Sequence, residues 1–355
     1  MNNDDLKKEL WEVPDAIRVI AGQSLPMELV EQIRAGRFSH AYWLGRGTSK
    51  LAAMWLGMMF FELSDFRVFH LPFSVACRNP GRDLSKVLYI AVSESGSTRE
   101  LIEAVKLGRE RGTYSYCIVN NRKSELARVS DCATCLDLGP GEGFTFKSFS
   151  GTILHAAKLA NAVGGGREDL SELQTLGNMA EEILKANPLQ GLAELLQKAE
   201  SAFVMGRGIL SPLAGNIALK IRELPRIPAE HKSSEEFLHG YGEASARPNC
   251  LVIVLAVPGI MLDSQMKTIR YLAARGANAV VLCPESIAGM MPKGIRVLTV
   301  AAGASNLFAG VSITVAVYRA LCSLVEMLGL DADDDDLVGR IVSPASFMTD
   351  FPELQ

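Results

Sequence analysis

Two loops rich in hydroxyl groups contain the residues of this chain whose types and spacing best suit chemistry. Gly45–Ser49 ends in a threonine and a serine, and Ser93–Thr98 carries four hydroxyls in six residues. Each loop follows an apolar run typical of a strand and opens a helical stretch, where free N–H groups and the helix dipole attract anions. A third loop, Gly139–Ser150, adds Thr145. The sequence predicts a phosphate-type anion site, although ordinary helix N-caps use the same residue types.

These loops do not match the common nucleotide-binding motifs. Gly45–Ser49 lacks the third glycine of a dinucleotide fingerprint, and the chain contains no GxxxxGK[ST] phosphate loop. Cys132 and Cys135 form a CxxC pair, but none of the five histidines supplies a second ligand pair at a suitable spacing. We therefore expect neither a cofactor nor a metal ion.

A second candidate group lies between Ala218 and Gly240. Pro225 ends a helix near Glu223, and a later helix delivers His239 just before a glycine. A carboxylate and an imidazole on non-repetitive backbone could move protons at a sugar carbon and a ring oxygen. Spacing alone favours the plainer explanation, which is a set of surface ion pairs.

The elements that would position these residues occur twice in the chain. Ala41–Gly47 recurs as Ala202–Gly208, and Val87–Val92 recurs as Val252–Val257. The strand-like runs are continuously apolar, which is typical of parallel strands buried on both faces. Amphipathic helical stretches separate them. The pattern predicts an α/β protein made of two tandem three-layer αβα sandwiches with mainly parallel, flavodoxin-like sheets.

The repeat also sets the expected domain boundaries. We expect an N-terminal helical extension over 1–36, a first sandwich with the hydroxyl loops over 37–165, a helical linker over 166–190, a second sandwich with the Glu/His segment over 191–330, and a tail over 331–355. The second copy differs in its loops, since Pro258–Met261 has no hydroxyls where the first copy has Ser93–Thr98.

Composition and charge argue against nucleic-acid-binding and membrane-spanning classes of protein. A net charge of -4 leaves no basic surplus for a phosphate backbone, so nucleic-acid binding is not expected. The polar N-terminus has no signal-peptide core, and Arg319 and Glu326 interrupt the apolar stretch Phe308–Leu328, so we expect no membrane span. The seven cysteines lie mostly in apolar runs and indicate reduced core residues of a cytoplasmic protein.

Several of these motifs resemble those of the sugar isomerase (SIS) family along nearly the whole chain. The two hydroxyl loops are similar to its phosphosugar loops, GxGTS and SxSGxT. Ala218–Glu223, Glu236–Gly240 and the opening Lys7–Pro14 are similar to the isomerase half of glucosamine-6-phosphate synthases. The resemblance implies a phosphosugar ligand and a homodimer whose sites are shared between subunits.

The resemblance also implies a role for each matching residue. Glu223 would move a proton between C1 and C2 of the sugar, and Lys220 beside it would set its ionisation. His239 would assist ring opening in the neighbouring subunit's site. The residues expected to hold the phosphate and nearby hydroxyls are Gly47, Thr48, Ser49, Ser93, Glu94, Ser95, Thr98 and Thr145. Arg340 is also expected among the substrate-binding residues.

Two departures from the synthases change the expected activity. The glutaminase part has no counterpart here, and Arg340 stands where those enzymes carry an imine-forming lysine. A guanidinium stays protonated and is a poor nucleophile for that step. The chain therefore resembles the fructosamine-6-phosphate deglycases of the same family, which hydrolyse amine adducts of 6-phosphosugars.

Two alternatives stay open at this point. One is an aldose–ketose or amino-sugar phosphate isomerase or deaminase, which would release no amino acid. The other, of a different class, is a phosphosugar-sensing regulatory protein, in which Glu223 and His239 would be idle.

Overall fold

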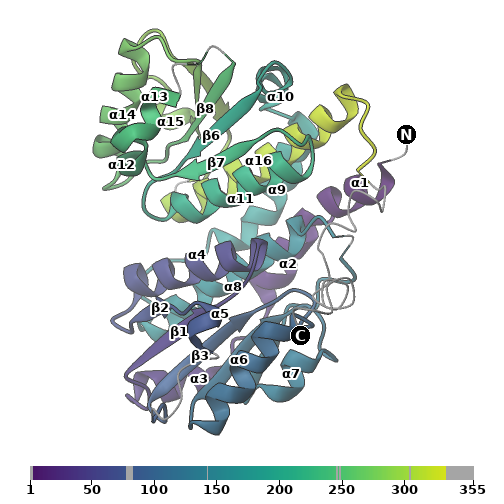
Figure 1. Ribbon diagram of the computed structural model, residues 1–355, viewed down its shortest axis with the longest axis vertical. Coiled ribbons are helices and arrows are strands. Elements are labelled where there is room, and N and C mark those ends of the chain that lie inside the picture. The colour runs from purple at the N-terminus through teal and green to yellow at the C-terminus, as the bar shows by residue number, and fades with distance from the viewer. Residues whose placement is uncertain are drawn as a thin grey trace, which may run out of the picture. The chain divides into compact units, whose positions relative to one another are not determined.

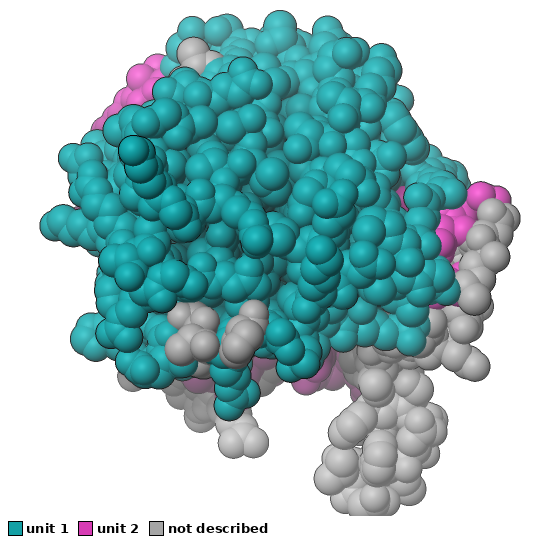
Figure 2. All heavy atoms as spheres, turned by 90° about the horizontal axis from the view of Figure 1, so that it is seen from above, with its two compact units in different colours: residues 1, 7–22, 169–330 teal, residues 2–6, 23–168, 331–355 magenta. Residues whose placement is uncertain are grey.

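The computed structural model describes residues 3–76, 83–141, 143–244, 247, 249–303 and 305–332. Contacts divide the chain into two compact units, which Figure 2 colours teal and magenta. Unit 1 is built from Lys7–Gly22 and Asp169–Leu330, and unit 2 is built around Gln23–Glu168. The first copy of the repeat therefore lies in unit 2 and the second copy in unit 1.

Unit 2 contains a five-stranded sheet in the order β2-β1-β3-β4-β5, and every pair of neighbours is parallel. Helix α4 packs against α8 on one face, and α6 packs against α5 and α7 on the other, which makes three layers (Figure 1). The strands are β1 (His40–Leu44), β2 (Val68–His70), β3 (Val87–Val92), β4 (Tyr114–Val119) and β5 (Cys132–Cys135). The helices are α3 (Met27–Arg34), α4 (Thr48–Leu63), α5 (Phe73–Ala76), α6 (Arg99–Glu110), α7 (Glu125–Val129) and α8 (Phe146–Val163).

Unit 1 repeats this plan with the order β10-β9-β8-β6-β7, again parallel throughout. Its strands are β6 (Ser201–Met205), β7 (Ala229–Lys232), β8 (Cys250–Leu255), β9 (Ala279–Pro284) and β10 (Arg296–Val300). Its longer helices are α2 (Val13–Gly22), α9 (Leu173–Ala186), α10 (Gln190–Gln197), α11 (Leu210–Glu223), α14 (Leu262–Ala274) and α16 (Asn306–Met327). Short elements complete it: α12 (Ser234–Glu236), the π-helical turn η1 (Phe237–Tyr241), α13 (Gly242–Ala244) and α15 (Glu285–Ala288).

The apolar strands form the centre of each unit, as their sequence predicts. Every residue of β3 and of β8 is buried, because helices cover both faces of the sheet. Each strand of one sheet has a counterpart at the same place in the other, so the predicted duplication and the predicted α/β sandwich class are both confirmed.

The N-terminal residues divide between the two units. Helix α1 (Asp4–Trp11) begins the described chain, and α2 packs against α9, so Lys7–Gly22 belongs with the second copy of the repeat. Helix α3 packs instead against α8 of unit 2. The predicted boundaries at 36, 165, 190 and 330 stay predictions, and most of the expected tail, including Arg340, lies outside the described residues.

One described helix, α16, is long and apolar enough to cross a membrane. Its most apolar stretch is 94% buried inside the structure, where α16 packs against α9, α10 and α11. Burial on that scale is typical of the central helix of a folded domain, and the apolar composition of α16 follows from that position.

Candidate active site

The turn after β1 places two hydroxyls at the start of α4. A Cβ atom at Gly45 would lie 2.7 Å from the carbonyl oxygen of Ser49, so only glycine fits this tight turn. Gly47 has a φ of 55°, a left-handed conformation that favours glycine. Thr48 and Ser49 are then the first two residues of α4, where backbone N–H groups have no partner within the helix.

The loop after β3 uses several of its hydroxyls to hold its own shape. The Ser93 hydroxyl oxygen accepts a hydrogen bond from the Gly96 N–H at 3.1 Å and lies 3.2 Å from the Thr98 hydroxyl. The Ser95 and Ser97 hydroxyls lie 2.8 Å apart. Gly96 packs so closely against Ser124 that a Cβ atom would lie 2.2 Å from the Ser124 Oγ.

The third loop brings α8 to the same edge of the sheet. Thr145 precedes α8 in a left-handed conformation with φ 61°, and its hydroxyl donates to the Thr48 hydroxyl at 3.1 Å. Ser148 is buried in the first turn of α8, and the Thr152 hydroxyl donates to its backbone carbonyl at 2.7 Å. The carboxyl ends of parallel strands meet at one edge, which brings these distant loops together.

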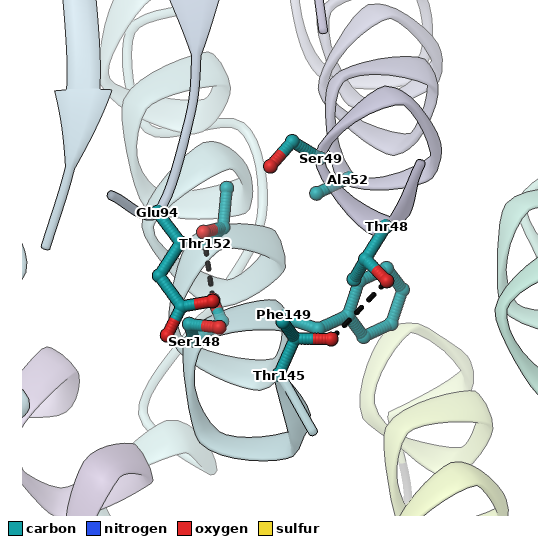
Figure 3. Close-up of a pocket in the computed structure, with 8 residues that line it drawn as sticks. All are labelled: Thr48, Ser49, Ala52, Glu94, Thr145, Ser148, Phe149 and Thr152. Carbon is teal, nitrogen blue, oxygen red and sulfur yellow. Dashed lines mark hydrogen bonds between the residues drawn. The ribbon is translucent and has the colours of Figure 1, made fainter. Parts of the chain in front are cut away.

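A shallow pocket that is open to solvent lies between these helix starts (Figure 3). The predicted binding residues that line it are Thr48, Ser49, Glu94 and Thr145. The residues that sequence analysis had not assigned to binding are Ala52, Ser148, Phe149 and Thr152. Helical spacing is the signal that points to them: Ser148, Phe149 and Thr152 follow Thr145 by three, four and seven residues along α8, and Ala52 follows Thr48 by four along α4.

Four of the predicted binding residues that the structure describes do not line the pocket. Gly47, Ser93, Ser95 and Thr98 lie in the turns beside it. The shape of both turns depends on them, through the left-handed glycine and through the hydrogen bonds of the serine loop. Any direct contact they make with a ligand stays a prediction.

Lys220 and Glu223 form an ion pair in the last turn of α11. The Lys220 ammonium donates to the Glu223 carboxylate at 2.6 Å, with side chains that are 1% and 45% exposed respectively. One turn earlier, the Tyr318 hydroxyl of α16 donates to the Asn216 side chain at 2.5 Å. The buried lysine thus holds a carboxylate that is itself open to solvent, which is an arrangement able to exchange protons.

His239 lies on the irregular backbone that the sequence predicts. The Ser233 hydroxyl caps α12 by accepting from the Glu236 N–H at 3.3 Å, and η1 follows directly. His239 has non-helical angles (φ −93°, ψ 55°), and Gly240 after it has a φ of 107°. The imidazole is exposed, and no hydrogen bond joins it to Glu223 within the described chain.

The fold, the hydroxyl-lined pocket of unit 2 and the Glu223 and His239 side chains of unit 1 define a class of double αβα protein. A model of the SIS domain matches residues 38–157 and 195–327, and the chain belongs to that family. The resemblance inferred from the loops is therefore confirmed.

Several curated relatives share one name, that of isomerizing glutamine–fructose-6-phosphate aminotransferases. The isomerizing glutamine–fructose-6-phosphate aminotransferase of Thermococcus kodakarensis is 29% identical over 291 residues, which is 78% of this chain and 48% of that protein. The enzyme of the same name from Aeropyrum pernix is 32% identical over 235 residues, or 62% of this chain and 37% of that protein. The chain thus spans about half the length, or less, of the curated relatives it matches.

Solved structures share the whole fold. The C-terminal domain of glucosamine-fructose-6-phosphate aminotransferase from Francisella tularensis superposes with a TM-score of 0.84 at 21% identity, over 94% of this chain and 98% of that one. Glucosamine-6-phosphate deaminase from Thermotoga maritima gives 0.73 at 19% identity, over 93% and 97%. At these identities the likeness concerns the fold.

Proposed function

We propose that this protein is an enzyme that acts on an amine adduct of a hexose 6-phosphate. The observation that carries the proposal is the ion pair in which buried Lys220 holds the half-exposed carboxylate of Glu223. A sensor would need only the pocket of unit 2, whereas a held carboxylate suits a general base. The names of the relatives, which concern aminated hexose 6-phosphates, support the substrate class.

In this proposal the pocket of unit 2 binds the phosphorylated end of the sugar. Hydroxyls of Thr48, Ser49 and Thr145 and the free N–H groups of the α4 start donate to the phosphate. Gly47, Ser93, Ser95 and Thr98 shape the turns that present those donors. This division of roles needs no metal ion and no organic cofactor.

Glu223 acts as the base in the proton transfer. With a ketosamine substrate, its carboxylate removes a proton from C1, and the resulting enaminol is reprotonated at C2 to give an imine at C1. Water then adds to the imine carbon and the C–N bond breaks, which releases an aldose 6-phosphate and the free amine. With a C2 adduct the proton moves from C2 to C1, and the products are a ketose 6-phosphate and the amine.

His239 and Lys220 complete the proposed machinery. The imidazole of His239 would protonate the ring oxygen when the sugar ring opens, acting in the site of a second copy of a homodimer. Lys220 would hold the Glu223 carboxylate in position through their hydrogen bond. Arg340, at the position of the synthase lysine, would form no imine, so the imine has to come from the substrate's own amine.

An isomerase or deaminase is the second candidate, and the fold shared with a glucosamine-6-phosphate deaminase favours it. The same proton transfer on a substrate with a free hydroxyl or a primary amine would isomerise or deaminate it. A phosphosugar sensor is the remaining alternative.

Incubation with a panel of 6-phosphorylated compounds tests the proposal. The panel contains fructose- and glucose-derived lysine adducts, glucosamine 6-phosphate and fructose 6-phosphate, and free amine and free sugar phosphate are measured together. Release of both products from an adduct is the expected result. Turnover of fructose 6-phosphate or glucosamine 6-phosphate alone would replace the deglycase with an isomerase or deaminase. Tight binding without any turnover would contradict an enzymatic role.

A further inference from the structure

Three polar residues follow one another along a single face of α11 and end at the proposed base. Asn216 precedes Lys220 by four residues and Glu223 follows it by three, so their side chains are neighbours on the helix surface. Asn216 and Lys220 are buried, whereas the Glu223 side chain is 45% exposed. Along this face Lys220 therefore has an acceptor on each side, the Asn216 side-chain oxygen and the Glu223 carboxylate.

A tyrosine of the neighbouring helix engages the first of these acceptors. Helix α16 packs against α11, and the Tyr318 hydroxyl donates to the Asn216 Oδ1 at 2.5 Å (Figure 1). The Asn216 Nδ2 is buried and meets no hydrogen-bond partner within the part of the chain that the structure describes. The Tyr318 hydroxyl is therefore the group that orients this amide.

The surroundings of Tyr318 keep its hydroxyl a donor. Tyr318 and Asn216 are both fully buried. Burial raises the pKa of Tyr318 well above its ordinary value of 10, and the nearby carboxylates of Glu9 and Glu223 raise it further. The phenol thus stays protonated near neutral pH and continues to donate to Asn216.

The two acceptors beside Lys220 differ in what they do for the proposed base. The Lys220 ammonium donates to the Glu223 carboxylate at 2.6 Å, which holds that carboxylate in place. Without the Tyr318 hydroxyl, the Asn216 oxygen would need another donor, because a buried acceptor that makes no hydrogen bond is costly. The Lys220 ammonium is a donor on the same face, one turn away. It would then divide between the amide and the carboxylate.

We propose that Tyr318 is a positioning residue for the proposed base, Glu223. Its hydroxyl engages the Asn216 oxygen and so leaves the Lys220 ammonium directed to the carboxylate. This inference rests on the proposed function and adds to it a residue that acts through Lys220 and not on the substrate. Loss of the Tyr318 hydroxyl should therefore slow proton transfer without weakening phosphosugar binding.

Two variants that break the same hydrogen bond test this inference. Tyr318→Phe removes the hydroxyl and leaves the Asn216 oxygen to compete, whereas Asn216→Leu removes that oxygen and keeps a similar volume. On the panel compound that the natural protein turns over, Tyr318→Phe should lower kcat roughly tenfold to a hundredfold and change KM less than about twofold, as expected for a misplaced catalytic group. Asn216→Leu should lower the free energy of unfolding about as much, yet keep kcat within about threefold, because no competing acceptor remains. Equal losses of kcat in the two variants would show a structural role and overturn the inference.

The environment of the Lys220 ammonium is measured without substrate, by heteronuclear NMR of the lysine ammonium groups in the ligand-free protein. The Lys220 signal is identified by its loss in Lys220→Met. It should move in Tyr318→Phe and stay in place in Tyr116→Phe, the matched control. Tyr116 is a buried tyrosine of unit 2 whose hydroxyl donates to Thr134 at 2.8 Å, so the control loses the same group from the same kind of hydrogen bond. The control should also keep the natural kcat.

The outcomes separate this inference from the proposed function. A Lys220 signal that does not move in Tyr318→Phe would overturn the inference even if the natural protein cleaves the adducts. A natural protein that turns over no compound of the panel would reject the proposed function, while the same NMR comparison would still decide whether Tyr318 directs Lys220.

Discussion

The two units share a backbone plan but differ at the carboxyl edges of their sheets. In unit 2, α4 begins with Thr48 and Ser49, whereas α11 of unit 1 begins with Leu210. Three residues after the N-cap, α8 carries Ser148 and α16 carries Phe308. These two matched positions are therefore polar in unit 2 and apolar in unit 1.

The two units also differ in which groups meet the free backbone N–H groups at the helix N-termini. In unit 1 the Glu172 carboxylate accepts a hydrogen bond from the Ser305 N–H at 2.8 Å, so an internal anion occupies the start of α16. Leu210 and Leu213 pack beside it, since a Cβ atom at Gly310 would lie within 3 Å of both side chains. In unit 2 the corresponding space is the hydroxyl pocket. A duplicated fold can therefore keep its sheet and change the residues at one edge, which buried leucines fill in unit 1 and a polar pocket occupies in unit 2.

Glu223→Gln is the change with the largest expected effect. It tests whether the chemistry depends on unit 1 while phosphosugar binding depends on unit 2. Loss of the base should lower kcat by roughly a thousandfold, within the range of general-base catalysis. Phosphosugar affinity, measured by calorimetry, should stay within about twofold, since an amide preserves size and hydrogen bonding.

Glu230→Gln serves as the control for that experiment. Glu230 is an exposed carboxylate of the same unit and pairs with Lys232 at 3.4 Å. It should retain full activity. A Glu223→Gln variant that turns over substrate at the natural rate would contradict the assignment of the base.

Thr48→Val tests the polar edge, and Leu210→Ala tests its apolar counterpart. Removing the Thr48 hydroxyl should weaken phosphosugar binding roughly tenfold, because hydrogen bonds to charged groups contribute about 1.5–3 kcal/mol. Leu210 is buried, so Leu210→Ala should lower the free energy of unfolding by about 2–5 kcal/mol and leave binding unchanged. Calorimetry and denaturant unfolding measure the two effects, and the opposite pattern would refute the comparison.

His155 marks a further difference between the two cores. Its Nε2 lies 2.8 Å from the Tyr116 hydroxyl, which donates onward to Thr134, whereas the tenth position after the N-cap of α16 is the apolar Val315. Burial lowers the pKa of His155 to about 3 from its ordinary 6.5. In the unfolded chain the imidazole of His155 is therefore protonated below about pH 6.5, whereas in the folded chain it stays neutral down to about pH 3.

Stability conferred by neutral His155 should fall as the pH drops through this window. The expected slope is about 1.4 kcal/mol per pH unit below pH 6.5. Urea unfolding at pH 7, 6 and 5 measures it, and His155→Gln, which cannot titrate, should remove that share of the slope. Identical slopes in both proteins would show that His155 is protonated in the folded state.

Arg46→Ala should have the smallest effect, since it concerns a feature that the two units share. Arg46 pairs with Glu100 at 2.8 Å, and its counterpart Arg207 pairs with Glu235 at 2.9 Å. Exposed pairs contribute about 0–1 kcal/mol. Unfolding free energy should change by less than about 1 kcal/mol and ligand affinity by less than about twofold. A larger loss of affinity would make Arg46 a ligand contact.

Local patterns explain why so much of the fold could be predicted. A short continuous apolar run such as Val87–Val92 favours a central parallel strand, and the glycine–hydroxyl loops that follow such runs then lie at strand ends. The break after Glu223 and the cap at Ser233 also follow from Pro225 and the serine themselves. These features depend on residues within a few positions of one another.

The sequence by itself determined the duplicated α/β plan, the family and the edge where hydroxyls gather. Only the tertiary structure decided which of them meet: Thr145 reaches Thr48 across 97 residues, while Ser93 and Thr98 turn toward each other. It also placed Lys220 out of water and left Glu223 half exposed. The physical reason is that exposure and pairing depend on elements distant in the chain, whereas strand, turn and cap patterns are set by neighbours.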